Sequence, residues 1–183
     1  MSEIYFHLQF PISEIRQWAS RYPEEDDDDI VAAGGRIRLG EFSRDNLEKI
    51  VMWKSARRVK LIQVNTDSEI QEALSVAVKA GEPRVAIGVL MGLCGVGLPM
   101  ASAILTAVKP DDYTVIDFRT LEALGVPDLS PDRNFYLLKY LPECKRLARE
   151  ACTSLRIIDR ALWSWSKHNK YSQTSSSVAD TFT

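Results

Sequence analysis

The sequence contains only three cysteines, Cys94, Cys144 and Cys152, and no CxxC pair. An odd number of cysteines without that spacing supplies neither a disulfide framework nor the ligands of a zinc or iron–sulfur site. The only two histidines, His7 and His168, lie at opposite ends of the chain. We therefore expect buried thiols in a reducing compartment and no metal site.

Long apolar runs are also absent, since none reaches the roughly 18 to 20 residues of a membrane-spanning helix. The first residues, MSEIYFHLQF, lack the basic-then-apolar pattern of a secretory signal. These features predict an intracellular, cytoplasmic protein without a membrane partner, and we expect a monomer.

A basic surplus is missing as well, because 23 Lys and Arg stand against 25 Asp and Glu, a net charge of −2. Such a balance argues mildly against tight nucleic-acid binding. The charges are unevenly placed, with six basic and eleven acidic residues in 1–50, but nine basic and four acidic residues in 132–170. The basic part can face phosphate, because binding responds to the local field. Alternatively, these charges are only solvated helix faces.

The 183 residues, 45% of them hydrophobic, suffice for one domain with a core. Apolar residues alternate over 4–10, which predicts a short N-terminal extended arm or strand. The acidic run at 24–29 predicts an exposed loop, and the glycines of 34–40 predict turns. Elsewhere apolar residues recur at helical spacing. We predict an all-α fold with a single helical domain over 1–169 and a polar, disordered tail over 170–183.

Local signals mark several helix ends. Ser43 is a predicted N-cap, and the helix that it begins ends in basic residues. Thr66 and Glu69 have the spacing of a capping box. The most informative segment, residues 90–117, reads LMGLCGVGLPMASAILTAVKPDDYTVID. It predicts a helix, a tight turn and a second helix over about 84–108.

The turn of this segment places Gly95 and Gly97 on either side of Val96. Glycine permits positive φ and close approach of the backbone, while Val96 is expected to enter the core. Pro99 suits the first turn of the following helix. Free amides at that helix start form a site for an anion such as a backbone phosphate. Tight helix packing is the alternative explanation.

Leu93, Gly95, Val96 and Gly97, the small-residue helix after them and Asp117 together resemble the helix-hairpin-helix DNA glycosylase superfamily. That superfamily includes endonuclease III, adenine glycosylase and the alkylbase glycosylases. The resemblance implies that the hairpin binds the DNA backbone and that Asp117 is the catalytic carboxylate. It covers about thirty residues firmly and agrees loosely with the helical pattern of residues 43–168.

Departures from the superfamily pattern narrow this expectation. Cys94 replaces the usual proline of the turn, and Pro99 stands where bifunctional members carry a Schiff-base lysine. The four-cysteine iron–sulfur segment is absent. The resemblance therefore implies a divergent, monofunctional glycosylase of base excision repair, a hydrolase without a cofactor. Some relatives hold a monovalent cation at the hairpin turn, and this possibility stays open here.

A carboxylate at position 117 has two interpretations. Cleavage of an N-glycosidic bond builds positive charge on the sugar, which Asp117 would stabilise while a damaged or mismatched base occupies a pocket. Asp also caps helices well, and Asp117 immediately precedes a predicted helix. The other candidate site residues have cationic or aromatic side chains. For DNA binding they are Lys54, Arg57, Arg58 and Arg119, and for the base pocket Trp53, Tyr113 and Trp163.

Three functions follow from these residues. The first is a monofunctional DNA glycosylase. The second is a noncatalytic helix-hairpin-helix module that binds the DNA backbone without sequence specificity. The third is a helical interaction protein whose glycine turn serves packing alone. Turn, small-residue helix and spaced Asp occur together, which favours the first two. The sequence does not decide whether the protein is an enzyme.

Overall fold

The computed structural model describes residues 4–23 and 27–179, with side chains as far as Asn169. These residues form helices and connecting segments but no strand, which confirms the all-α prediction for this part of the chain. The chain divides into two compact units. Unit 1 comprises Met1–Tyr22, Asp117–Ser130 and Glu143–Thr183, and unit 2 comprises Pro23–Ile116 and Pro131–Pro142. The single domain over 1–169 stays a prediction.

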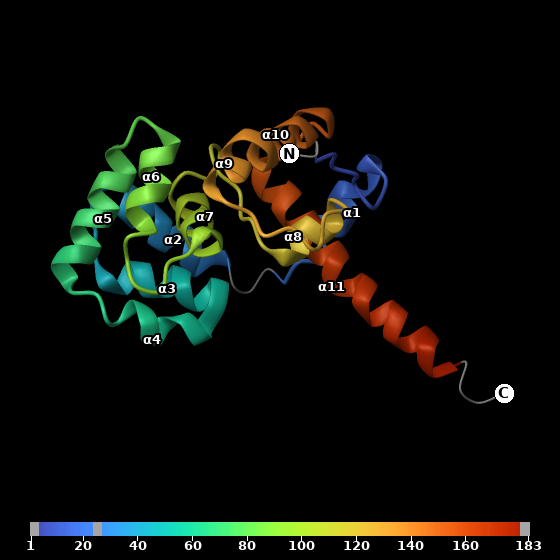
Figure 1. Ribbon diagram of the computed structural model, residues 1–183, viewed down its shortest axis with the longest axis horizontal. Helices are drawn as coiled ribbons and strands as arrows, with labels where there is room; N and C mark the ends of the chain where they lie inside the picture. Colours follow the sequence, from blue (N-terminus) through green and yellow to red (C-terminus); the bar gives the residue numbers. More distant parts are fainter. Residues whose placement is uncertain (1–3, 24–26, 180–183) are drawn as a thin grey trace. The chain divides into compact units, whose positions relative to one another are not determined.

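Unit 2 contains most of the shorter helices (Figure 1). They are α2 (Asp27–Arg38), α3 (Arg44–Ser55), η3 (Ala56–Arg58), α4 (Val59–Ile62), α5 (Asp67–Lys79), α6 (Pro83–Leu90), α7 (Leu98–Val108), α9 (Arg133–Phe135) and the π-helix η4 (Tyr136–Tyr140). Helices α2 and α3 pack on each other and on α7, while α5 packs on α6. The side chains of Ile37, Leu47, Leu74, Ile87 and Ile104 fill the core between them.

The start of α2 corrects two expectations. Residues Asp27, Asp28 and Asp29 form its first turn, so this part of the acidic run is helical, while 24–26 lie outside the described residues. Carboxylates at a helix start, with Arg36 and Arg38 in the last turn, complement the helix dipole. Gly34 and Gly35 lie inside this helix and form no turn.

Tertiary contact explains why α2 tolerates Gly34. A Cβ at position 34 would lie 2.0 Å from the carbonyl oxygen of Ala107 on α7. Only a glycine lets the two helices approach this closely. The residue thus sets the position of α7, the helix that follows the glycine turn.

The local capping predictions are confirmed. The Ser43 hydroxyl accepts a hydrogen bond from the Asn46 N–H at 3.3 Å. The Thr66 hydroxyl accepts from the Glu69 N–H at 3.2 Å, and a Glu69 carboxylate oxygen accepts from the Thr66 N–H at 2.6 Å. The Thr66 N–H, and then the Thr66 hydroxyl, which donates to the same carboxylate oxygen at 2.9 Å, hold the pKa of Glu69 below its usual value. The Ser43 bond caps the start of α3, and the Thr66–Glu69 bonds cap the start of α5.

Unit 1 is built around the long helix α11 (Leu155–Ala179), on which α1 (Ile15–Ala19) and α8 (Phe118–Ala123) pack. The helix α10 (Leu141–Glu150) precedes α11, and η1 (Ile12–Glu14) precedes α1. Leu121, Ile158 and Leu162 are among the buried residues of the unit. Helix α11 continues to Ala179 through much of the segment 170–183 that we predicted to be a tail, and 180–183 lie outside the described residues.

The N-terminal arm packs beside the end of α8 without forming a strand. The N–H groups of His7 and Gln9 donate hydrogen bonds of 2.9 Å to the carbonyls of Leu124 and Ala123. Bonds at alternate residues fit the alternation of apolar side chains seen in the sequence. Of the two predicted alternatives, the arm is the one that forms.

Candidate nucleic-acid interface

Residues 83–108, which we call the hairpin segment, contain α6, a turn over 91–97 and α7. Gly95 and Gly97, the two glycines that flank Val96, differ in backbone conformation. Gly95 has φ +83°, a conformation that favours glycine, while Gly97 has φ −90° and is the N-cap of α7. Leu93 and Val96 are 7% and 5% exposed, so both side chains enter the core as predicted for Val96. The identity of this segment as a helix-hairpin-helix motif stays a prediction.

The inner side of the turn lies against α4. A Cβ at Gly95 would be 2.8 Å from Leu61 Cβ and 3.2 Å from the Leu61 carbonyl carbon. The close approach that we expected at this glycine is therefore to the protein's own backbone. The outer side is different, because Gly97 and Pro99 are exposed and a Cβ at Gly97 meets only the Pro99 Cδ, at 3.9 Å.

Asn65, three residues after the end of α4, holds the turn by direct hydrogen bonds. Its side-chain amide donates to the carbonyls of Ile62 and Cys94 at 2.8 and 3.1 Å, and its oxygen accepts from the Cys94 N–H at 2.8 Å. Asn65 is 6% exposed, so these bonds satisfy a buried side chain. Nothing in the sequence pattern singled this residue out, because it is 29 positions from the turn.

The start of α7 has amides that no side-chain cap satisfies. Its N-cap, Gly97, makes no side-chain capping bond, and Pro99 in the first turn has no N–H. The first N–H groups of a helix have no partner within the helix and lie at the positive end of its dipole. Of the residues that carry these amides, Gly97 is exposed, whereas Leu98 and Met100 are each only 5% exposed.

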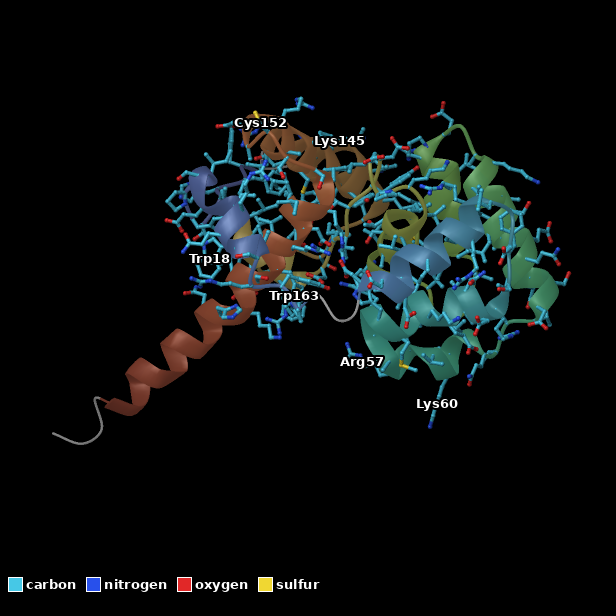
Figure 2. The ribbon with its side chains drawn as sticks, turned by 180° about the vertical axis from the view of Figure 1, so that it is seen from behind. Trp18, Arg57, Lys60, Lys145, Cys152 and Trp163 are labelled. Carbon is cyan, nitrogen blue, oxygen red and sulfur yellow. The ribbon has the colours of Figure 1, made fainter. Side chains whose placement is uncertain are left out.

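An exposed basic cluster adjoins the turn. Its members, Arg57, Arg58 and Lys60, form no ion pair with any carboxylate of the described residues. Figure 2 shows Arg57 and Lys60 projecting from the ribbon. Lys60 directly precedes Leu61, the residue that touches Gly95, so the cluster and the turn share one region of unit 2. Lys54, also predicted to bind DNA, lies half-buried on α3.

Asp117 is the N-cap of α8 in unit 1. One carboxylate oxygen accepts hydrogen bonds from the N–H groups of Arg119 and Thr120, at 3.0 and 3.1 Å. The Thr120 hydroxyl accepts from the Asp117 N–H at 3.0 Å and completes a capping box. Asp117 is half-buried. This geometry matches the capping interpretation, and it accounts for an Asp at this position without catalysis.

Buried tyrosines hold the segment before Asp117 within unit 2. The hydroxyls of Tyr136 and Tyr140, both on η4, donate to the carbonyls of Thr114 and Val115 at 2.8 and 2.6 Å. The Ile116 N–H donates to the Ser102 hydroxyl of α7 at 3.1 Å. The backbone of Thr114 and Val115 is therefore bound to η4, and that of Ile116 to α7, the helix that follows the glycine turn.

The three predicted pocket aromatics lie in different surroundings. Trp53 is half-buried on α3 of unit 2. Tyr113, also in unit 2, is 5% exposed and leaves little ring surface for a base. Burial first, and then the charge of Asp112, raises the pKa of the Tyr113 hydroxyl. Trp163 is half-buried on α11 of unit 1, with Arg119 over its ring.

The cysteines correct one expectation. Cys144 is buried, but Cys94 and Cys152 are exposed, and none of the three forms a disulfide. Among the described residues, no group of three or more His, Cys, Asp or Glu side chains could hold a metal ion. Within the same residues, no helix has the length and apolar character needed to cross a membrane.

Comparison with protein-family models, with curated proteins and with solved structures found no match for this chain.

Proposed function

We propose that unit 2 binds the DNA backbone through the outer side of the hairpin turn and the exposed basic cluster, without reading sequence. The observation that supports this proposal is the contact of Gly95 with Leu61, because Leu61 directly follows Lys60 and lies three residues after Arg58. The exposed Gly97 at the start of α7 and three cations without carboxylate partners then contribute to one binding region.

The chemistry of this region suits phosphate. Exposed N–H groups at a helix start bind one phosphate oxygen at short range, and neighbouring cations bind adjacent phosphates of the same strand. Such contacts fix position but carry no base information. The net charge of −2 does not oppose this binding, because the negative charge is concentrated elsewhere in the sequence.

The salt dependence of binding tests the proposal. Three neutralised phosphates give a slope of about −2.7 for log K against log salt, so a fourfold rise in salt weakens binding about 40-fold. Replacing Arg57, Arg58 and Lys60 together by Gln should remove most of this slope. Fluorescence anisotropy with a labelled duplex of arbitrary sequence measures both quantities.

Arg84 provides a matched control on the same unit. It is exposed, forms no ion pair within the described part of the chain, and begins α6 at the end away from the turn. Arg84→Gln should therefore leave duplex affinity nearly unchanged. Equal losses in Arg84→Gln and the triple variant would show only a general charge effect and would refute the proposed site.

DNA glycosylase activity is a second candidate for the same protein. The observation in its favour is that Asp117 directly follows Ile116, whose N–H is bonded to Ser102 of α7. A half-buried carboxylate would then stabilise the positive sugar while water attacks it. Pro99 supplies no amine, so the reaction would be hydrolytic and monofunctional.

The activity is measured as base release from a panel of lesion-bearing duplexes. Asp117→Asn keeps a good N-cap and should abolish base release while folding is retained. Equal release by wild type and Asp117→Asn would remove Asp117 from catalysis. Release of no base by wild type, with duplex binding intact, leaves the noncatalytic module as the function.

A further inference from the structure

Unit 1 carries a second set of cationic and aromatic side chains, at the contact of α8 with α11. We call Phe118, Arg119, Trp163 and Lys167 the cation–aromatic cluster. The Arg119 guanidinium lies 5.0 Å from the Phe118 ring centre and 5.4 Å from that of Trp163. The Lys167 Nζ lies 4.6 Å from the Trp163 ring centre. The position of Trp163 on α11 is marked in Figure 2.

The two cations of this cluster have no carboxylate partner. Neither Arg119 nor Lys167 forms an ion pair with the side chains that the structure describes. By contrast, Arg156, which lies on α11 like Lys167, forms an ion pair with Asp159. Two positive charges on one indole ring repel each other, and an anion bound between them would relieve that repulsion.

Phe118 adds a flat apolar surface to this charge. Phe118, the first residue of α8, is 57% exposed. Arg119 already occupies one neighbouring position, so an aromatic ligand on the exposed ring would extend a stack of alternating rings and cations. Tyr22 packs edge-on against Trp163, with the two ring centres 5.1 Å apart.

We propose that the cation–aromatic cluster binds single-stranded nucleic acid, with a phosphate at Arg119 and Lys167 and a base stacked on Phe118. Cationic grooves with exposed rings are the usual means of binding unpaired strands. Duplex DNA keeps its bases stacked on one another, and an acidic peptide has no flat face for the ring. The exposed Phe118 therefore favours an unpaired strand over both.

The binding is measured by anisotropy with a labelled single-stranded oligothymidine. All proteins carry Arg57→Gln, Arg58→Gln and Lys60→Gln, which removes most of the contribution of the site proposed on unit 2. Phe118→Ala should weaken binding about tenfold, the typical effect of losing one base–aromatic stack. Lys167→Gln should weaken it and lower the salt slope by about 0.7.

Matched controls exist on the same unit. Tyr5 is 76% exposed on the N-terminal arm, and Tyr5→Ala should leave binding unchanged. Lys145 lies on α10 in unit 1, and Lys145→Gln should do the same (Figure 2). Circular dichroism and urea unfolding check that Phe118→Ala retains the fold, as expected for an exposed ring.

Three outcomes would overturn the proposal. The first is equal affinity of Phe118→Ala and Tyr5→Ala for oligothymidine, which would show that no base stacks on Phe118. The second is competition by polyglutamate as strong as that by unlabelled oligothymidine, which indicates an acidic protein partner. The third is absence of single-strand binding. Duplex binding by the protein with an intact basic cluster is measured separately, so a failure at either site does not affect the other.

Discussion

The close crossing of α2 and α7 makes two neighbouring glycines behave in opposite ways. A Cβ at Gly34 would lie 2.0 Å from the Ala107 carbonyl oxygen and 2.4 Å from its carbonyl carbon. At Gly35, one residue along the same helix, nothing lies within 4 Å of the added atom. Both residues have helical φ, so the substitutions differ in packing alone.

The expected magnitudes follow from two terms. Alanine is favoured over glycine within a helix by about 1 kcal/mol. At Gly35 this is the whole effect, and Gly35→Ala should stabilise the protein by about 0.5–1 kcal/mol. At Gly34 the helices must separate by roughly an ångström, and overpacking costs about 1–3 kcal/mol. Backbone contact places Gly34→Ala at the upper end, for a net loss of about 2 kcal/mol.

Urea unfolding followed by circular dichroism measures both changes. Because α7 follows the glycine turn, Gly34→Ala should also weaken duplex binding, whereas Gly35→Ala should not. A stable Gly34→Ala protein, with a gain equal to that of Gly35→Ala, would refute the close crossing of α2 and α7.

Six further substitutions have expected outcomes. Gly95→Ala should destabilise the protein by about 1–2 kcal/mol, because φ is +83° and α4 lies against the added atom, whereas Gly97→Ala should change urea unfolding little. Asp117→Ala should cost about 1 kcal/mol through loss of the cap of α8, and Asp117→Asn less, by the same measurement. Cys152 has φ +48°, so Cys152→Gly should raise the melting temperature, and a lower one would contradict the strain. Burial raises the pKa of Tyr113, so its contribution to stability is complete below the ordinary tyrosine pKa and is lost as the pH rises above it. Tyr113→Phe should reduce that alkaline loss in unfolding measured against pH.

Features that depend on neighbouring residues could be predicted from the sequence. Ser43 and Thr66 act as caps because a hydroxyl reaches an amide three residues on, and that spacing is visible in the chain. The core position of Val96 and the positive φ of Gly95 likewise follow from the turn itself.

Features that depend on distant residues could not be predicted. The local sequence predicts a turn at Gly34, because the contact that requires a glycine there is with Ala107 on another helix. The bonds of Asn65 to Cys94 and the approach of Leu61 to Gly95 join segments about thirty residues apart. In unit 1, the exposure of Phe118 depends on how α8 packs on α11, which local periodicity does not specify.

The most direct test of backbone binding by the hairpin segment is an amide NMR titration of the isotope-labelled protein with a short duplex. We expect the amides of Gly97 and of the first turn of α7 to shift most, together with those of Arg57 and Arg58, and added salt to reverse the shifts. Amides of this region that stay unmoved while the duplex binds would contradict this expectation.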